Sequence, residues 1–319
     1  MNDSATPRRL AAIDIGTVTT RLLVADVSED RVSEVVRSTD ITHLGEGLTQ
    51  TGRLGDAAMA RVSEVIARYK DEMERSGVEH VTALATSASR DAENAAEFVA
   101  LLARHGIVPE VIAGAREANL AFMGATYDVE CERVLVADLG GGSTEVILGS
   151  SAIEDGVRRQ DIEVARSIDV GSKRLTEMFL ASDPPTRGEL DEARSFAAQG
   201  FRPYFDGLKE RPEEMIAVAG TATSLSAIKQ ELAVYDSSRV HHSCLSGSDL
   251  SDLLEMLAAL PLQRRKEVIG LDPGRAPVIV AGTLILETLV GMAGLDSTLV
   301  SEHDILYGIL LDTYRELGS

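Results

Sequence analysis

Residues 134–148 read VLVADLGGGSTEVIL, an aliphatic run, a glycine-rich turn and a second aliphatic run. This pattern predicts a strand, a tight turn and a returning strand. Residues 10–25 read LAAIDIGTVTTRLLVA and have the same organisation. A shift of 124 residues places Asp14 on Asp138, Gly16 on Gly140, Thr19 on Ser143 and Thr20 on Thr144. One Asp-x-Gly turn is weak evidence because both residues favour turns, but a repeated one predicts two similar lobes.

Strands and helices alternate around these turns. Apolar side chains recur at helical spacing from Met59 to Met73 and stop at Gly77, which predicts an amphipathic helix. A second helix is expected around Phe98 to His105. Short aliphatic runs predict strands at 81–85, 108–112 and 216–219. This alternation favours an α/β fold with a mostly parallel sheet flanked by helices.

Length and charge indicate how many domains the protein has and which partners are unfavourable for it. The 319 residues suggest about two domains of roughly 150 residues. The net charge of −20 argues against nucleic acid and anionic membranes as partners. Cys131 and Cys244 lack metal-ligand spacing, the segment Met1–Arg9 lacks the apolar core of a signal peptide, and the apolar stretch 276–292 is short for a membrane span. We therefore expect a soluble cytoplasmic protein.

The triple glycine is suited to binding phosphate. Without side chains, Gly140, Gly141 and Gly142 let backbone N–H groups approach an anion, and Ser143 and Thr144 add hydroxyl donors. Asp138 repels phosphate and needs a cation between them, for which Mg²⁺ is the natural candidate. Glu145 is a second carboxylate for that cation. The alternative interpretation is a tight hairpin without a ligand.

Several ordered segments resemble the Ppx/GppA phosphatases. They are residues 11–26, ATSASR at 85–90, VADLGGGSTE at 136–145, VAGTAT at 218–223, and shorter matches at 169–171, 174–177 and 300–304. That family contains exopolyphosphatases and guanosine pentaphosphate phosphohydrolases on the actin-like ATPase fold. The resemblance implies two actin-like (ribonuclease H-like) lobes with the active site in the cleft between them. We place domain I at Met1–Ala125, with a C-terminal helix from about 303 to 319 packing back on it, and domain II at 126–302.

The resemblance also implies roles for single residues. The segment 112–118 matches a Gly-x-Glu-Glu-Ala motif whose second glutamate is the catalytic base, here Glu117. From the residues alone, the favoured interpretation is a glutamate that complements a helix dipole, and the resemblance is what favours catalysis. Arg90 follows a strand, where a guanidinium can clamp phosphate, and the alternative for it is a surface salt bridge.

The remaining predicted ligands are assigned by type. Metal ligands are Asp138 and Glu145, holding Mg²⁺ with Mn²⁺ as the alternative, and a monovalent cation is a further family expectation. Substrate-binding residues are Asp14, Gly16, Thr17, Thr19, Arg90, Gly140, Gly141, Gly142, Ser143, Thr144, Gly220, Thr221 and Arg265. For Gly220 and Thr221 an ordinary helix start is the alternative. Further candidates for a basic channel are Arg166, Lys173, Arg174, Arg264, Lys266 and Arg275, with His241 and His242 weaker.

Two positions depart from the family pattern. Val18 stands where the family usually has an asparagine, which removes an amide donor. Arg116 replaces the first glutamate of the pair, and we expect its guanidinium to lower the pKa of Glu117.

The expected activity is hydrolysis of the terminal phosphoanhydride of inorganic polyphosphate, by a homodimer as the family suggests. Guanosine pentaphosphate is the alternative substrate. A sugar or acid kinase of the same superfold fits less well, because Glu117 and the Arg90 segment match the phosphatases. A sensor of polyphosphate or nucleotide without catalysis is the alternative from another class.

Overall fold

The computed structural model describes residues 7–29, 31–154 and 157–318. The chain forms two compact units, which we call the first unit (Met1–Val129, Ala152–Arg159 and Asp304–Ser319) and the second unit (Glu130–Ser151 and Gln160–His303). The sequence placed the main boundary a few residues earlier, after Ala125. Most of the segment Met1–Arg9, where no signal peptide was predicted, lies outside the described residues.

The sheet of the first unit has the order β3-β2-β1-β4-β5. Its strands are β1 (Arg8–Ile15), β2 (Thr19–Ser28), β3 (Arg31–Ile41), β4 (His80–Ala85) and β5 (Glu110–Val111). β1, β2 and β3 are antiparallel neighbours, whereas β4 runs parallel to both β1 and β5. The strands predicted around the first turn and at 81–85 are confirmed. The strand predicted at 108–112 is only two residues long.

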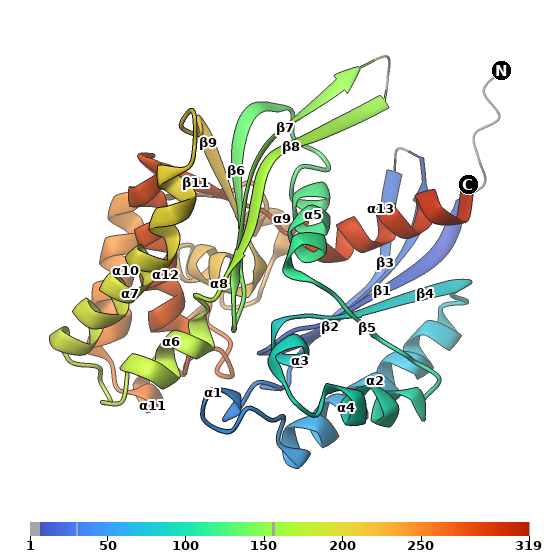
Figure 1. Cartoon of the computed structure of the whole chain (residues 1–319), viewed down its shortest axis with the longest axis horizontal. Coiled ribbons are helices and arrows are strands. Elements are labelled where there is room, and N and C mark those ends of the chain that lie inside the picture. Colours follow the sequence, from blue (N-terminus) through green and yellow to red (C-terminus); the bar gives the residue numbers. More distant parts are fainter. Residues whose placement is uncertain (1–6, 30, 155–156, 319) are drawn as a thin grey trace. The chain divides into compact units, whose positions relative to one another are not determined.

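Helices cover both faces of this sheet. They are α1 (Leu48–Thr51), α2 (Asp56–Arg75), α3 (Ser87–Asp91), α4 (Ala95–Ala103), α5 (Gly114–Ala125) and α13 (Ile305–Gly318). α2 is the helix predicted from the spacing of Met59 to Met73, and it packs with Phe98 of α4 against alternate residues of β1. The other residues of β1 pack against α5 and α13. α13 thus joins the first unit from the far end of the chain, lying beside α5 (Figure 1).

The second unit is built around a sheet of order β10-β11-β9-β6-β7-β8. Its strands are β6 (Cys131–Leu139), β7 (Thr144–Glu154), β8 (Val157–Ile168), β9 (Glu214–Val218), β10 (Cys244–Ser246) and β11 (Ser297–Val300). β6 is antiparallel to β7 and parallel to β9, as β1 is to β2 and β4. The strand predicted at 216–219 ends one residue early, because Ala219 has a φ of 68° and starts a helix.

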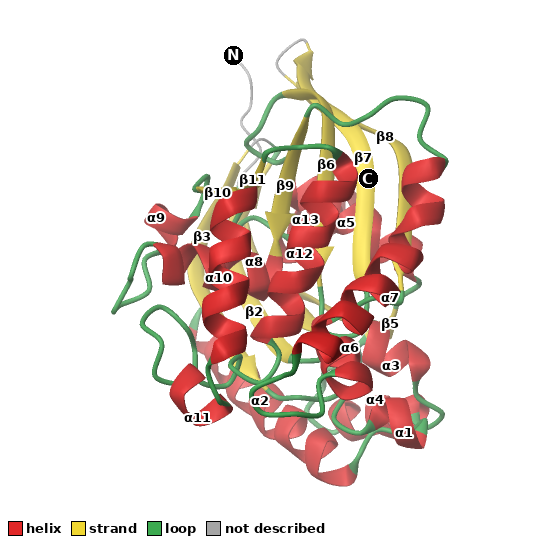
Figure 2. Ribbon diagram, turned by 90° about the vertical axis from the view of Figure 1, so that its left-hand side faces the viewer, coloured by secondary structure: helices red, strands yellow, loops and turns green. Residues whose placement is uncertain are grey.

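The helices of the second unit are α6 (Ser172–Phe179), α7 (Arg187–Asp206), α8 (Ala219–Lys229), α9 (Ser237–Val240), α10 (Gly247–Ala259), α11 (Leu262–Arg265) and α12 (Ile279–Ala293). α12 lies between α10 and α7 (Figure 2), and its residues are buried on nearly every side. It is the apolar stretch near 276–292, so that stretch is a core helix of this unit. Among the described residues no helix has the length and apolar character needed to cross a membrane.

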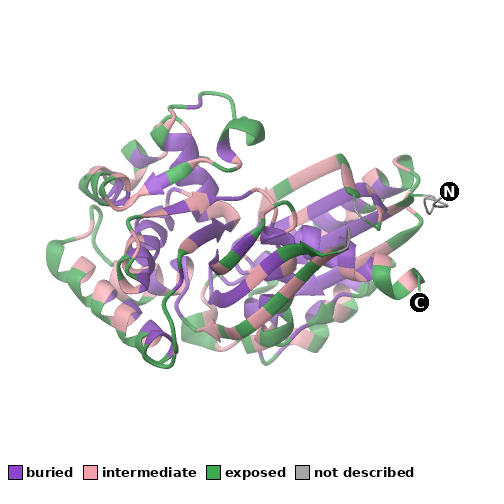
Figure 3. Ribbon diagram, turned by 90° about the horizontal axis from the view of Figure 1, so that it is seen from above, coloured by how far each residue is buried: buried purple, intermediate pink, exposed green. Residues whose placement is uncertain are grey.

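Buried residues follow the strands that carry the two turns. Figure 3 shows buried stretches, in purple, running along the strands, with exposed residues mainly in loops and on outer helix faces. β1 and β6 are buried over their last six residues, up to Ile15 and Leu139. Each turn therefore begins where a strand leaves a well-packed core, which fixes its position within its own unit.

Candidate active site

The two turns have the same backbone hydrogen bond. The N–H of Gly16 donates to the carbonyl of Thr19 at 2.9 Å, and the N–H of Gly140 donates to the carbonyl of Ser143 at 3.0 Å. These are equivalent positions under the shift of 124 residues. The repeat seen in the sequence is therefore a repeat of turn geometry. The amides of Gly16 and Gly140 are used inside the turns, so these two predicted phosphate ligands do not offer their N–H groups to a ligand.

Each turn is hydrogen-bonded to a second loop of its own unit, which we call its bracing loop (residues 42–45 in the first unit and 171–174 in the second). In the first unit, the N–H groups of Thr42 and His43 donate to the carbonyl of Val18, and that of Gly45 to the carbonyl of Thr17. In the second unit, the N–H groups of Ser172, Lys173 and Arg174 donate to the carbonyls of Gly140 and Gly141.

The bracing loops approach so closely that each has a glycine at the contact. A Cβ added to Gly45 would lie 2.4 Å from the methyl group of Thr17. One added to Gly171 would lie 2.4 Å from the carbonyl carbon of Gly142. Each turn is thus held through its backbone carbonyls and by packing. These contacts do not use the N–H groups in the middle of the turn.

The middle of each turn offers unused donors. Within the described part of the chain, the backbone N–H groups of Thr17 and Val18, and those of Gly141, Gly142 and Ser143, make no hydrogen bond. Consecutive free amides form an anion-binding concavity. The guanidinium of Arg174 lies beside the second turn, where its Nε donates to the carbonyl of Gly142 at 2.8 Å. Both turns therefore have the donors that phosphate binding needs.

The hydroxyl groups of the second turn donate hydrogen bonds within the unit, and their role as phosphate donors stays a prediction. The Oγ of Ser143 donates to Glu145 at 3.0 Å, and the Oγ1 of Thr144 donates to the carbonyl of Val170. Since each hydroxyl has a single proton to donate, the amides are the donors that remain.

The carboxylates of the two turns have opposite neighbours. Asp14 pairs across the strands with Arg21, and the equivalent Asp138 pairs across the strands with Glu145. Arg21 donates to the Oδ2 of Asp14 at 2.6 and 3.0 Å and also contacts Asp304. Burial raises the pKa of Asp14, and the guanidinium counteracts this effect.

Asp138 and Glu145 lie on the same face of their sheet, because cross-strand partners do. Both side chains are buried, and Glu145 accepts hydrogen bonds from Ser143 and, at 2.6 Å, from Ser167. Two adjacent carboxylates with neighbouring hydroxyls are a set of hard oxygen ligands of the kind that Mg²⁺ and Ca²⁺ prefer. The residues present therefore fit a divalent cation.

Glu117 is a buried acid in the first turn of α5. Its Oε2 accepts a hydrogen bond from the Nη1 of Arg90 at 3.0 Å, and the Thr86 hydroxyl also hydrogen-bonds to it. Burial raises its pKa to about 7, even though Arg90 and Thr86 both lower it, and the charge of Asp14 raises it further. A carboxyl group that titrates near neutral pH is suited to accept a proton from water.

Comparison with known proteins places this arrangement in a family. The family model of the Ppx/GppA phosphatases matches residues 23–314. Exopolyphosphatase 2 of Mycobacterium tuberculosis is 38% identical over 323 residues, which cover 95% of this chain and 98% of that protein. The chain belongs to the Ppx/GppA phosphatase family.

Solved structures agree with this assignment. An exopolyphosphatase-like protein superposes with a TM-score of 0.91 at 33% identity, over 98% of this chain and all of that one. The Ppx/GppA family member of Aquifex aeolicus gives a TM-score of 0.79 at 29% identity, over 98% and 99% of the two chains. The predicted fold class, two actin-like α/β lobes, is confirmed, and so is the expectation that the protein is a phosphoanhydride hydrolase. Ppx/GppA phosphatases generally depend on a divalent metal.

The position of Arg116 corrects one expectation. This departure from the Ppx/GppA pattern was predicted to lower the pKa of Glu117. Its guanidinium instead lies 3.4 Å from Asp312 of α13, at a half-exposed position. Neighbouring helix residues point about 100° apart, so adjacency in sequence did not bring the two side chains together. The guanidinium that acts on Glu117 is that of Arg90, and this ion pair was not predicted.

Arg265 is also corrected. We predicted that it binds substrate, but the residue is only 4% exposed and its guanidinium lies inside the second unit. Its guanidinium donates to the carbonyls of Leu257, Leu260 and Ala276. Other members of the predicted basic channel are held by neighbouring groups: Lys173 pairs with Glu177, Arg264 with Glu267, and Arg166 donates to the carbonyl of Ala165.

Gly220 and Thr221 are packed against other parts of the second unit. The carbonyl of Gly220 accepts a hydrogen bond from Arg275, whose guanidinium occupies the space of a Cβ at this glycine. The side chain of Thr221 is buried against Gly282 of α12. These contacts explain the residue types without a ligand, so both remain predicted rather than observed substrate contacts.

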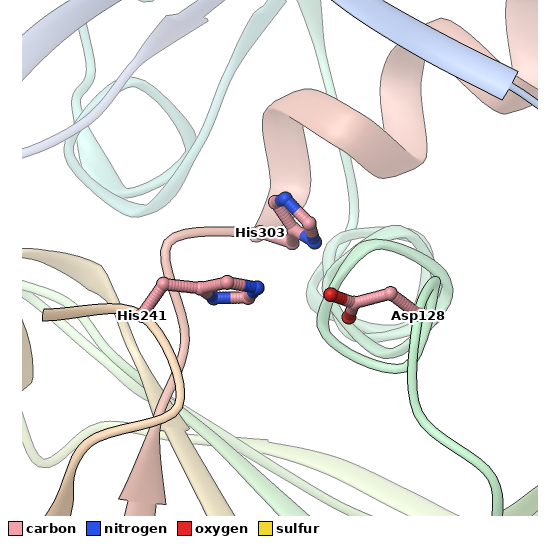
Figure 4. Close-up of side chains that lie close together, drawn as sticks. All are labelled: Asp128, His241 and His303. Atoms are coloured by element: carbon pink, nitrogen blue, oxygen red, sulfur yellow. The ribbon is translucent and has the colours of Figure 1, made fainter. Parts of the chain in front are cut away.

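His241 and His242 were weak candidates for the basic channel, and the structure stacks them. Their ring centroids are 3.8 Å apart, and that of His303 is 4.3 Å from His241 (Figure 4). The N–H of Glu302 donates to the Nδ1 of His241, which therefore acts as an acceptor.

Proposed function

We propose that the protein is an exopolyphosphatase, which hydrolyses the terminal phosphoanhydride of inorganic polyphosphate and releases orthophosphate. The observation that carries the proposal is Glu117, a buried carboxyl group with a pKa of about 7 held by Arg90. The name of the relative from Mycobacterium tuberculosis, 38% identical over nearly the whole chain, supports polyphosphate as the substrate.

In this proposal Glu117 accepts the proton of the attacking water. Arg90 keeps the carboxylate oriented and partly ionised at neutral pH. The free amides of Thr17, Val18, Gly141, Gly142 and Ser143 donate hydrogen bonds to phosphoryl oxygens, which gain charge as the bond to the leaving phosphate breaks. All of these donors are backbone groups fixed by braced turns, so they need little reorganisation during the reaction.

Asp138 and Glu145 hold a divalent cation in this proposal, with Mg²⁺ as the preferred ion and Mn²⁺ as a substitute. When bound, such an ion neutralises phosphate charge and polarises the phosphoryl oxygen. Asp14 does not share this role, because its Oδ2 already accepts hydrogen bonds from the guanidinium of Arg21. Its predicted place in phosphate binding is accordingly indirect, through the shape of the first turn.

Release of orthophosphate from polyphosphate, guanosine pentaphosphate and ATP tests the substrate. We expect polyphosphate to give the highest kcat/KM. A higher value for guanosine pentaphosphate would assign the other activity of the family, and binding of polyphosphate without release of phosphate would make the protein a sensor. Release of a phosphorylated sugar or acid from ATP would indicate a kinase.

Glu117→Gln tests the catalytic role, because glutamine keeps the size of the side chain but does not accept a proton. We expect kcat to fall about 10²- to 10⁴-fold, with polyphosphate affinity unchanged or tighter. A kcat within a fewfold of the wild-type value would mean that another group activates water.

The proposal also includes a homodimer and a cytoplasmic location. Analytical sedimentation tests the oligomeric state, and cell fractionation tests the location.

A further inference from the structure

Two buried hydroxyl groups stand out in the first unit, because no hydrogen-bond partner lies near them among its described residues. Ser87 and Ser89 lie on α3 and are only 3% and 1% exposed, and among the described residues neither Oγ has a partner. A buried hydroxyl that lacks a partner is costly, and native proteins rarely contain two of them so close together. Their positions relative to Glu117 suggest that they bind a ligand.

α3 presents these hydroxyls on either side of the face that contacts Glu117. Thr86 and Arg90 are four residues apart, share one side of the helix, and both hydrogen-bond to Glu117. Ala88 is on the opposite side and packs in the core with α2 and α4. Since successive residues are about 100° apart, Ser87 and Ser89 flank the Glu117 side.

The same edge of the sheet also carries the first turn. β4 and β1 are parallel neighbours, and the N–H of Thr86 donates to the carbonyl of Ile15 at 3.1 Å. α3 therefore begins beside the turn in which the amides of Thr17 and Val18 are free. The carboxyl ends of parallel strands are where ligands bind in α/β proteins.

We propose that the hydroxyls of Ser87 and Ser89 bind the substrate, by donating hydrogen bonds to oxygens of its phosphoryl groups. The inference rests on the proposed function and adds two ligands to it. A phosphoryl oxygen is the acceptor that fits, because the neighbouring unused groups are backbone N–H donors and the nearby cation is Arg90. Hydroxyl donors would hold phosphate without adding positive charge that would further lower the pKa of Glu117.

Ser87→Ala and Ser89→Ala test the proposal with two readouts. In steady-state hydrolysis of polyphosphate, loss of a hydrogen bond to a charged oxygen should raise KM about tenfold to a hundredfold. In thermal unfolding without ligand, each variant should melt at the same temperature as the wild type or higher, because a hydroxyl without a partner has been removed. The increase in melting temperature caused by pyrophosphate should be smaller in each variant.

Ser226→Ala is the matched control. Ser226 is 1% exposed, but its hydroxyl bonds to that of Ser243 at 2.6 Å. Its alanine variant should melt at a lower temperature and keep the wild-type KM. If an alanine variant on α3 does not fold, Ser87→Cys or Ser89→Cys replaces it, because the thiol is a weaker donor of similar shape.

An unchanged KM together with an unchanged pyrophosphate shift would overturn the assignment of that serine. A lower melting temperature without ligand would also overturn it, because it would show that the hydroxyl has a partner in the free protein. The pyrophosphate measurement needs only phosphoryl oxygens. It therefore still tests the two serines if the wild-type protein fails to hydrolyse polyphosphate, an outcome that would refute the proposed function alone.

Discussion

The turn at 14–20 and the turn at 138–144 differ at one decisive position. Opposite the buried Asp14 stands Arg21, and opposite the buried Asp138 stands Glu145. The two backbones are otherwise alike, with the same internal hydrogen bond, a bracing loop and free amides. The first turn therefore has a guanidinium opposite its carboxylate, whereas the second has two carboxylates opposite each other on one face of its sheet.

This difference shows how one residue can give two copies of the same turn different roles. In the first turn, the guanidinium of Arg21 contacts both Asp14 and Asp304, so protein groups hold the buried carboxylate. Two adjacent buried carboxylates are favourable only with a counter-ion or a proton, because like charges repel at this separation. The second turn is thus suited to cation binding and the first to a supporting role in phosphate binding.

The largest effect is expected when the second turn is given the charge pattern of the first. Glu145→Arg places a guanidinium opposite Asp138, as Arg21 stands opposite Asp14. We expect activity to fall at least about a thousandfold, since the loss of metal stabilisation amounts to several kcal/mol of barrier. Activity at increasing concentrations of Mg²⁺ and Mn²⁺ measures the effect, and circular dichroism checks the fold.

Asp138→Asn is the companion variant because it changes the charge and keeps the size. It should lose activity at ordinary Mg²⁺ concentrations without unfolding. Wild-type turnover with unchanged metal dependence in either variant would show that the cation binds elsewhere.

The reverse change in the first turn should affect stability. Arg21→Met leaves Asp14 and Asp304, each 4% exposed, without their shared guanidinium. Removing one partner of a buried ion pair costs about 3–5 kcal/mol of unfolding free energy, which urea denaturation measures. Arg9→Met is the control, because the Arg9–Asp26 pair is about one-third exposed and its loss should cost much less. Equal losses in the two variants would contradict this account.

The sequence was sufficient for features that depend on local pattern. The repeat, the strands around both turns and α2 follow from residue periodicity, which folding preserves. β3 was missed because its side chains are exposed or half-buried and form no aliphatic run, so its pairing with β2 defines it. The Arg90–Glu117 pair joins residues that are 27 positions apart in the sequence. The buried guanidinium of Arg265 bonds to carbonyls up to 11 positions away. Residue periodicity does not predict contacts of this kind.

The raised pKa of Glu117 makes the free energy of unfolding depend on pH, and it determines the direction of that dependence. Its pKa is about 7 in the folded protein and near 4.5 when unfolded, so between these values the folded state binds more protons. Stability from this group is therefore present below pH 4.5 and is lost as the pH rises to 7, by up to about 1.4 kcal/mol per pH unit. Glu117→Gln should be more stable than the wild type at pH 8, with the difference shrinking at pH 5.

Urea denaturation at several pH values measures this difference. The same titration should set the acidic limb of kcat/KM near pH 7 in the wild type, because Glu117 must lose its proton to act as a base. A stability difference that does not change with pH would mean that Glu117 remains ionised throughout.

The smallest effect is expected at Arg116, the guanidinium next to Glu117 in sequence. Because it faces Asp312 on the surface, Arg116→Glu should leave the pH–rate profile in place and change the unfolding free energy by less than about 1 kcal/mol. Arg90→Gln is its counterpart: losing the hydrogen bond and charge that lower the pKa of Glu117 should move the acidic limb to higher pH. A shift with Arg116→Glu and none with Arg90→Gln would reverse the assignment. The comparison separates a charge that is near Glu117 along the chain from one that contacts its carboxylate.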